Sequence, residues 1–124
     1  METLRKVLAG CAIDDIAFLE DGSIRRHYRF TSEFILFSGH FPGYPILPAF
    51  IQVLTALVLM EEVKGHELIL ESLKKAKFHI EIKPDTIVEV TCREETTRGE
   101  RTIGTNLRVD GKLAATFSLV CREP

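Results

Sequence analysis

Apolar and polar residues alternate along several stretches of the chain, with the period of two that is typical of half-buried β-strands. The pair Asp21-Gly22, which favours a tight turn, precedes the first clear stretch. We therefore predict a hairpin from a short strand near residues 16–19 into a strand over 24–30. The apolar positions of the second strand share one face: Ile24, Tyr28 and Phe30.

A different pattern covers residues 48–64, which contain no glycine or proline after Pro48. Proline suits the opening turn of a helix, and Gly65 suits the residue that follows the last turn. Only two positions before Glu61 are polar, so this predicted helix is apolar on nearly every side. A helix of that kind is normally surrounded by other structure, so we expect it to be central.

Alternation returns after the helix and continues almost to the end of the chain. Pro84-Asp85 separates the first two of these later stretches, and Asp110-Gly111 joins the last two with the spacing of a two-residue hairpin turn. The polar segment 94–100 indicates a loop or a loose hairpin end. The predicted strands cover residues 75–83, 86–93, 102–109 and 112–121.

A single sheet that curls around the apolar helix is the most economical way to bury it. The sequence therefore predicts an α+β fold, with a curved antiparallel sheet wrapped around one long central helix. A chain of 124 residues has the size of one domain, which we expect to span residues 1–124. A core of this size is often completed by a partner subunit, so we expect an oligomer.

Composition narrows the class of protein. With 45% hydrophobic and 27% charged residues the chain is typical of soluble globular proteins. A net charge of -2 without a dense basic run argues against a nucleic-acid-binding protein.

The three cysteines are odd in number and lack C-x-x-C spacing, which favours core positions in a reducing compartment: Cys11, Cys92 and Cys121. The longest apolar stretch, 49–60, is shorter than the ~20 residues of a bilayer span. The first residues lack the continuous apolar run of a signal peptide. We therefore expect a cytoplasmic protein without a membrane span.

The segment GHFPGYPILPAF, residues 39–50, resembles the signature of the hotdog-fold β-hydroxyacyl-acyl carrier protein dehydratases. In that family the motif reads roughly G-H-F-P-G-x-P-x-x-P-G and continues into the central helix. The resemblance extends to KFHIEIKPDTIVEV after the helix and to VDGKLAATFSLV in the closing hairpin. It covers roughly residues 13–121 and implies a hotdog fold.

This resemblance implies a reaction and an assembly. Such enzymes remove water from a (3R)-hydroxyacyl thioester of acyl carrier protein, or a related thioester, and use no metal or organic cofactor. Two hotdog subunits place their sheets edge to edge, and each active site lies at the interface. A histidine of one chain takes a proton from C2, and an acidic residue on the other chain's helix protonates the leaving hydroxyl.

His40 matches the position of the catalytic base, and an imidazole with an ordinary pKa of about 6.5 can both accept and return a proton. The backbone N–H groups of Ala49 and Phe50 belong to the unpaired donors at the start of the helix, which suit an oxygen that becomes negative. Ala49 stands where the family usually has glycine. The resemblance assigns substrate contacts to Phe41, Gly43, Pro48, Ala49, Phe50 and Leu54.

The chain departs from the family pattern fourteen residues after His40, where the acidic residue is replaced by Leu54. Leucine cannot donate a proton. Glu61 lies on nearly the same helix face but ~10 Å farther along the axis, and with Glu62 it is expected to form a solvated helix end. A homodimer would then hold two bases and no obvious acid.

Three interpretations remain open at this point. The protein is a dehydratase or related thioester enzyme that acts through His40, or half of a heterodimer whose other subunit supplies the carboxylate. Alternatively it binds an acyl chain or its carrier protein without chemistry. A hotdog thioesterase is a weaker fourth interpretation, because it too normally needs a helix carboxylate.

The expected partners follow from the same resemblance. They are an acyl carrier protein or coenzyme A thioester and a second hotdog subunit, identical or different, with a higher oligomer also open. Carrier proteins have acidic surfaces, so a basic rim is expected near the site. The candidates for that rim are Arg25, Arg26, Lys74, Lys75 and Lys77.

Overall fold

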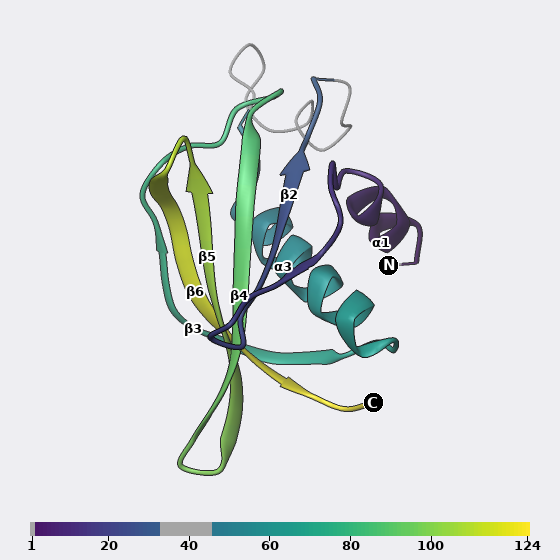
Figure 1. Ribbon diagram of the computed structural model, residues 1–124, viewed down its shortest axis with the longest axis vertical. Helices are drawn as coiled ribbons and strands as arrows, with labels where there is room; N and C mark the ends of the chain where they lie inside the picture. The colour runs from purple at the N-terminus through teal and green to yellow at the C-terminus, as the bar shows by residue number, and fades with distance from the viewer. Residues whose placement is uncertain (1, 33–45) are drawn as a thin grey trace.

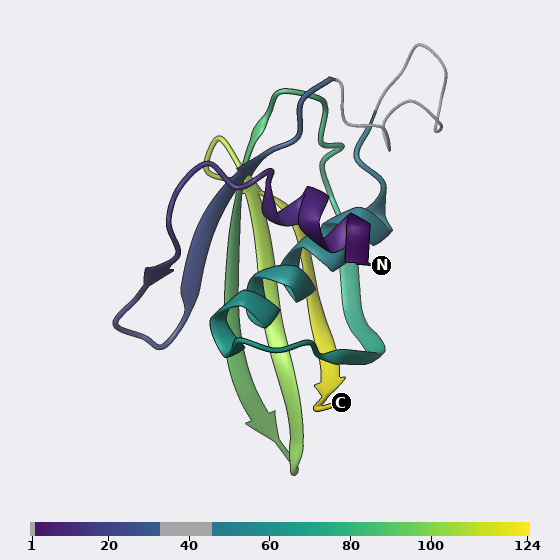
Figure 2. The same cartoon turned by 90° about the vertical axis from the view of Figure 1, so that its right-hand side faces the viewer.

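A computed structural model of the protein describes residues 2–32 and 46–124. Within these residues, six antiparallel strands form one sheet in the order β1-β2-β4-β5-β6-β3. The sheet curves around α3, which crosses its concave face (Figures 1 and 2). The elements are α1 (Glu2–Ala9), β1 (Ala17–Phe18), β2 (Ile24–Arg29), α3 (Ala49–Lys64), β3 (Ile69–Phe78), β4 (Ile87–Thr97), β5 (Glu100–Val109) and β6 (Lys112–Arg122).

The central helix forms as the sequence predicts, one residue shorter at its start. Pro48 is the N-cap, with φ -60° and ψ 147°, because the residue before a helix keeps extended backbone angles. Gly65 ends the helix in the left-handed region at φ 79°, and its N–H donates to the Glu61 carbonyl. Most of α3 is buried against the sheet, so the expectation of a central helix is confirmed.

The core lies between α3 and the inward-facing positions of the strands. Tyr28 of β2 is fully buried and stacks on Phe30, with ring centroids 6.3 Å apart. Alternate positions of the neighbouring strands continue this face, so the period-two pattern correctly identified the inner side of the sheet. Its fully buried members on β4, β5 and β6 include Val88, Val90, Leu107, Phe117 and Leu119.

The first strand after the helix differs from the prediction. β3 begins at Ile69 and ends at Phe78, whereas alternation predicted a strand over 75–83. The ladder with β6 ends at Phe78. The N–H groups of His79 and Ile80 both donate to the Ala114 carbonyl, which breaks the regular pairing, and the Ile82 side chain is then buried in the core. The early part of β3 is an exposed edge, so it needs no apolar alternation.

The segment 94–100 also differs from the prediction. β4 continues through Thr97, and β5 begins at Glu100, so only Arg98 and Gly99 form the turn. Both turn residues have positive φ, 53° and 78°, which suits the twist of a two-residue hairpin. The hairpin therefore extends beyond the C-terminal end of α3 (Figure 2).

Helix α1 was not identified from the sequence. It lies against α3 on the side away from the sheet (Figures 1 and 2), and Leu8 is fully buried there. With only eight residues it would be marginal in isolation, so its stability comes from this packing. None of the helices among residues 2–32 and 46–124 is long and apolar enough to cross a bilayer.

Candidate active site

The start of α3 presents backbone donors to its surroundings. The N–H groups of Ala49 and Phe50 donate to no other described residue, whereas those of Ile51 and Gln52 reach the Pro48 carbonyl at 3.1 and 3.2 Å. Ala49 and Phe50 are both exposed, the Phe50 side chain by 56%. N–H groups without a partner among residues 2–32 and 46–124, together with the positive end of the helix dipole, make this end suited to an oxygen that gains negative charge.

The backbone that enters the helix is fixed on both sides. The Leu47 N–H donates to the Ile82 carbonyl at 2.7 Å, and the Gln52 side-chain amide donates to the Leu47 carbonyl at 3.1 Å. Leu47 and Pro48 are buried. These contacts connect the start of α3 to the irregular segment between β3 and β4.

Three of the predicted site residues lie outside the described residues: His40, Phe41 and Gly43. Their roles stay predictions. The structure does describe Pro48, Ala49, Phe50 and Leu54, and it brings them together in the N-cap and first two turns of one helix.

Leu54 lies one helical turn after Phe50 and packs partly against the core. It is a hydrocarbon side chain in the position where the resemblance expects a proton donor. The first turn of α3 holds no acidic residue either. The described part of the site therefore supplies hydrogen-bond donors and apolar surface, but no carboxyl group.

The expectation of a solvated Glu61 is wrong. Its side chain is only 8% exposed, because α1 covers it and places Arg5 beside it. Arg5 donates from Nε and Nη2 to the two carboxylate oxygens at 2.9 and 3.2 Å, and the Leu68 N–H donates at 2.8 Å. Glu62 is exposed as predicted and pairs with Arg26 at 2.6 Å. These hydrogen bonds join α1, α3 and the start of the next segment through the Glu61 carboxylate, so its role is structural.

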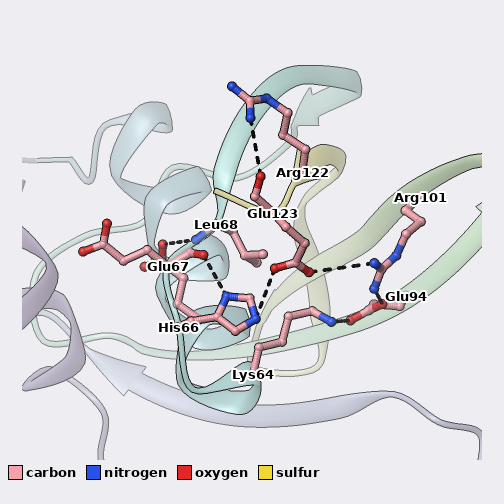
Figure 3. A network of polar contacts seen from close by, with 9 residues as sticks. Lys64, His66, Glu67, Leu68, Glu94, Arg101, Arg122 and Glu123 are labelled. Carbon is pink, nitrogen blue, oxygen red and sulfur yellow. Dashed lines mark hydrogen bonds and ion pairs between the residues drawn. The ribbon is translucent and has the colours of Figure 1, made fainter.

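The C-terminal end of α3 carries a charged network that the sequence analysis missed. Lys64 pairs with Glu94 of β4 at 2.5 Å, and Arg101 of β5 approaches Glu94 at 3.1 Å and Glu123 at 3.8 Å (Figure 3). Burial would raise the pKa of Glu94, but the hydrogen bonds from Lys64 and Arg101 hold it below its ordinary value. No sequence spacing links these residues, because three separate elements supply them.

This network lines a cavity of about 520 Å³. The His66 ring contacts Glu123 at 3.1 Å and the Glu67 carbonyl at 2.9 Å at its border (Figure 3). The apolar lining comes from Leu68, Ile103, Val120 and Cys121. The cavity lies at the opposite end of α3 from the predicted site, and ion pairs already engage most of its charged groups.

The other polar candidates have local partners. The His27 ring contacts Asp14 at 2.6 Å, and the His27 backbone N–H donates to the same carboxylate at 2.9 Å. Burial would raise the pKa of Asp14, but these hydrogen bonds and the nearby positive charge hold it below its ordinary value. These contacts give His27 a structural role in joining β2 to the segment before β1.

The cysteines occupy unreactive positions. All three are free thiols, and burial raises the pKa of Cys92 to about 12. Burial, followed by the charges of nearby glutamates, raises the pKa of Cys121 to about 11. Thiols with raised pKa values are poor nucleophiles at neutral pH, which agrees with the expected core role.

Fewer basic side chains are available for the expected rim than the sequence suggests, because some of them form ion pairs within the chain. Arg26 is engaged by Glu62 and by the Asp14 carbonyl, and Lys74 pairs with Glu100 at 2.7 Å. Lys75 and Lys77 of β3 are exposed and have no ion-pair partner among the described residues. These two lysines keep their charge available to a partner.

Comparison with known proteins identifies the family of the chain. The family model described as ApeI-like, ApeI dehydratase, matches residues 17–116. The chain belongs to this family. It is also 31% identical over 117 residues to the 3-hydroxyacyl-[acyl-carrier-protein] dehydratase FabZ of Clostridium botulinum (strain Kyoto / Type A2), covering 87% of this chain and 81% of that protein. The prediction of a dehydratase-like protein is therefore confirmed.

Solved structures show the fold of this ApeI-like chain. The dehydratase heterocomplex ApeI:P from Xenorhabdus doucetiae has a TM-score of 0.73 at 15% identity, covering 90% of this chain and 96% of that one. The (R)-hydratase from A. caviae involved in PHA biosynthesis has a TM-score of 0.61 at 15% identity, covering 82% and 94%. The prediction of a hotdog fold is confirmed.

Proposed function

We propose that the chain is the base-bearing subunit of a dehydratase that removes water from 3-hydroxyacyl thioesters of acyl carrier protein, in fatty acid or related lipid biosynthesis. The observation that carries this proposal is Leu54. The start of α3 has N–H groups that donate to no described residue and an apolar surface, but with Leu54 it lacks the carboxyl group that dehydration needs. The FabZ relatives, named as acyl carrier protein dehydratases, support the substrate class.

In this proposal His40 removes a proton from C2 of the acyl chain. The electrons of the C2–H bond form the C2=C3 double bond, and the C3–O bond breaks. The hydroxyl leaves as water after it takes a proton from an acid. The N–H groups of Ala49 and Phe50 hold the thioester carbonyl oxygen, which gains negative charge as C2 loses its proton.

The acid comes from a second hotdog subunit in this proposal. On α3, Glu61 is held by Arg5 and the Leu68 N–H, and Glu62 is held by Arg26, so neither carboxylate is available near Leu54. A general acid contributes roughly 10² to 10⁴ in rate, or about 3 to 5 kcal/mol of the barrier. The heterocomplex named for the ApeI:P structure supports a division of labour between two different subunits.

The second subunit docks on the free edge of β3. This strand is ten residues long and, among the described strands, pairs with β6 alone, whereas the opposite edge, β1, has two residues. A long unpaired edge offers backbone N–H and C=O groups to another strand. Its exposed large apolar side chains support burial in such an interface: Ile69, Leu73 and Phe78.

The carrier protein approaches the border of this interface. Lys75 and Lys77 are exposed there, and their charges suit an acidic partner. A coenzyme A thioester would bring negative phosphates to the same lysines. The proposal includes a cytoplasmic location, which the three free thiols support.

The test compares the chain alone with the chain mixed with a hotdog subunit that carries a helix glutamate. Dehydration of 3-hydroxybutyryl thioester on carrier protein should be slow for the chain alone and rise at least 100-fold in the mixture. The gain should disappear with His40→Ala. Fast turnover by the chain alone would favour the homodimer instead, and tight acyl binding with no turnover in either sample would favour a binding protein.

A further inference from the structure

Gln52 is a buried amide in the first turn of the apolar helix. Its side chain is 4% exposed, and its Nε2 donates to the Leu47 carbonyl at 3.1 Å. Because a carbonyl only accepts hydrogen bonds, this contact determines which side of the amide faces Leu47. The other side, Oε1, is buried without a partner among the described residues. A buried acceptor without a partner is destabilising, so stability alone gives a weak reason for glutamine here.

The contact is made where the helix lacks an ordinary cap. Pro48 occupies the N-cap and has no side-chain oxygen or nitrogen that could bond to the first turn. Gln52 instead reaches back from inside the helix to the residue before the N-cap. Leu47 is held from the other side by the Ile82 carbonyl, so its peptide groups are fixed in two directions.

We infer that Gln52 is a positioning residue for the carbonyl-binding donors of the active site. The inference rests on the proposed function, in which the N–H groups of Ala49 and Phe50 bind the thioester carbonyl. These donors follow Leu47 by two and three residues, so a change in the Leu47 peptide redirects them. Gln52 keeps the turn in the orientation that aims both N–H groups at one oxygen.

The test measures how much the protein prefers a ligand with a carbonyl. The two ligands are S-butyryl-pantetheine and S-butyl-pantetheine, which has CH₂ in place of the carbonyl, and their Kd values are measured by calorimetry. The wild-type chain should prefer the carbonyl ligand. Gln52→Met, of similar shape but without the donor, should reduce that preference by about 2- to 12-fold, the equivalent of one hydrogen bond. Its Tm should stay unchanged or rise.

Two further variants separate positioning from a structural role. Thr55→Val removes another buried polar group of α3, whose hydroxyl donates to the Ile51 carbonyl at 2.7 Å, and should leave the preference unchanged. Gln52→Glu can donate to Leu47 only when its carboxyl is protonated. Its preference should therefore approach that of wild type at acidic pH and fall as the pH rises.

The outcomes separate this inference from the proposed function. Equal preference in wild type and Gln52→Met, or an equal loss in Thr55→Val, would overturn the role of Gln52 while the proposed function stands. Failure of the wild-type chain to bind either ligand would overturn both. A lost preference in Gln52→Met with retained Tm, together with the pH response of Gln52→Glu, would support the inference.

Discussion

The two ends of α3 differ in how their polar groups are satisfied. At the C-terminal end, the carboxylate of Glu61 accepts hydrogen bonds from Arg5 and Leu68, and Lys64 pairs with Glu94. At the N-terminal end, the N–H groups of Ala49 and Phe50 donate to no other described residue and no acidic side chain stands nearby in the first turn. In the part of the chain that the structure describes, the C-terminal end is saturated and the N-terminal end is open.

This difference supports the proposed function, which places the substrate at the N-terminal end of α3. Charged groups that satisfy one another stabilise the fold and have little capacity left for a substrate. Oriented donors in an apolar setting stabilise a developing negative charge without further rearrangement. In the proposed function the saturated end is therefore structural and the open end binds the substrate, although the saturated end borders the cavity of about 520 Å³.

The largest expected effect comes from supplying the missing acid at the open end. Leu54→Glu should raise the dehydration rate of the chain alone by roughly 10² to 10⁴, because a carboxyl group can protonate the leaving hydroxyl. The rate is measured on 3-hydroxybutyryl-pantetheine by formation of the enoyl product. Leu54→Gln, of matched size but without an acidic proton, should show no gain. An equal rate in both variants would contradict the assignment of this position.

Breaking the saturated end should affect stability rather than activity. Arg5→Met leaves the buried Glu61 carboxylate with the Leu68 N–H as its one hydrogen-bond partner among the described residues, and should lower the free energy of unfolding by about 2 to 3 kcal/mol. Urea unfolding measures this loss. The double variant Arg5→Met with Glu61→Leu should recover part of it, because no buried charge remains. A fall in turnover per folded molecule would contradict the separation of the two ends.

A carboxylate placed at the N-terminal end of α3 should occupy the N–H groups there, so that they are no longer available to a substrate. Phe50→Asp puts a negative charge beside the free N–H groups, where it stabilises the helix by about 0.3 to 1 kcal/mol but competes with the substrate carbonyl. The Kd of S-butyryl-pantetheine should rise several-fold while Tm stays level or increases. Phe50→Asn, which lacks the charge, is the matched control for lost apolar contact. An equal change in Kd for Asp and Asn would argue against competition for the N–H groups.

The smallest effect is expected from the exposed part of the C-terminal network. Glu94 has a folded-state pKa below its ordinary value, so its stabilising contribution is complete above the unfolded pKa of about 4.3 and is lost as the pH falls through the folded value. Glu94→Gln should lower stability at pH 7 by about 0.2 to 1 kcal/mol, because the partners are partly solvated. The difference from wild type should vanish in acid and shrink in high salt. A difference that persists at pH 2 would contradict this origin.

Local sequence patterns predicted the elements that follow from one local feature, either continuous apolarity or alternation of apolar and polar residues. The span of α3 follows from continuous apolarity between Pro48 and Gly65, and the β5–β6 hairpin follows from alternation around Asp110-Gly111. The same reasoning placed the start of β3 six residues too late, because an edge strand forms by backbone pairing and leaves no apolar pattern. It also missed α1, whose formation depends on packing against α3.

The sequence by itself determined the central apolar helix, the curled antiparallel sheet and the absence of a carboxyl group at Leu54, because each depends on residue type or on a local period. Only the tertiary structure decided that the Glu61 carboxylate accepts hydrogen bonds from Arg5, which lies 56 residues earlier. It also decided that the Gln52 side chain donates to the Leu47 carbonyl. Such contacts depend on which elements the fold brings together. A charge or an amide shows its role only when its partner is known.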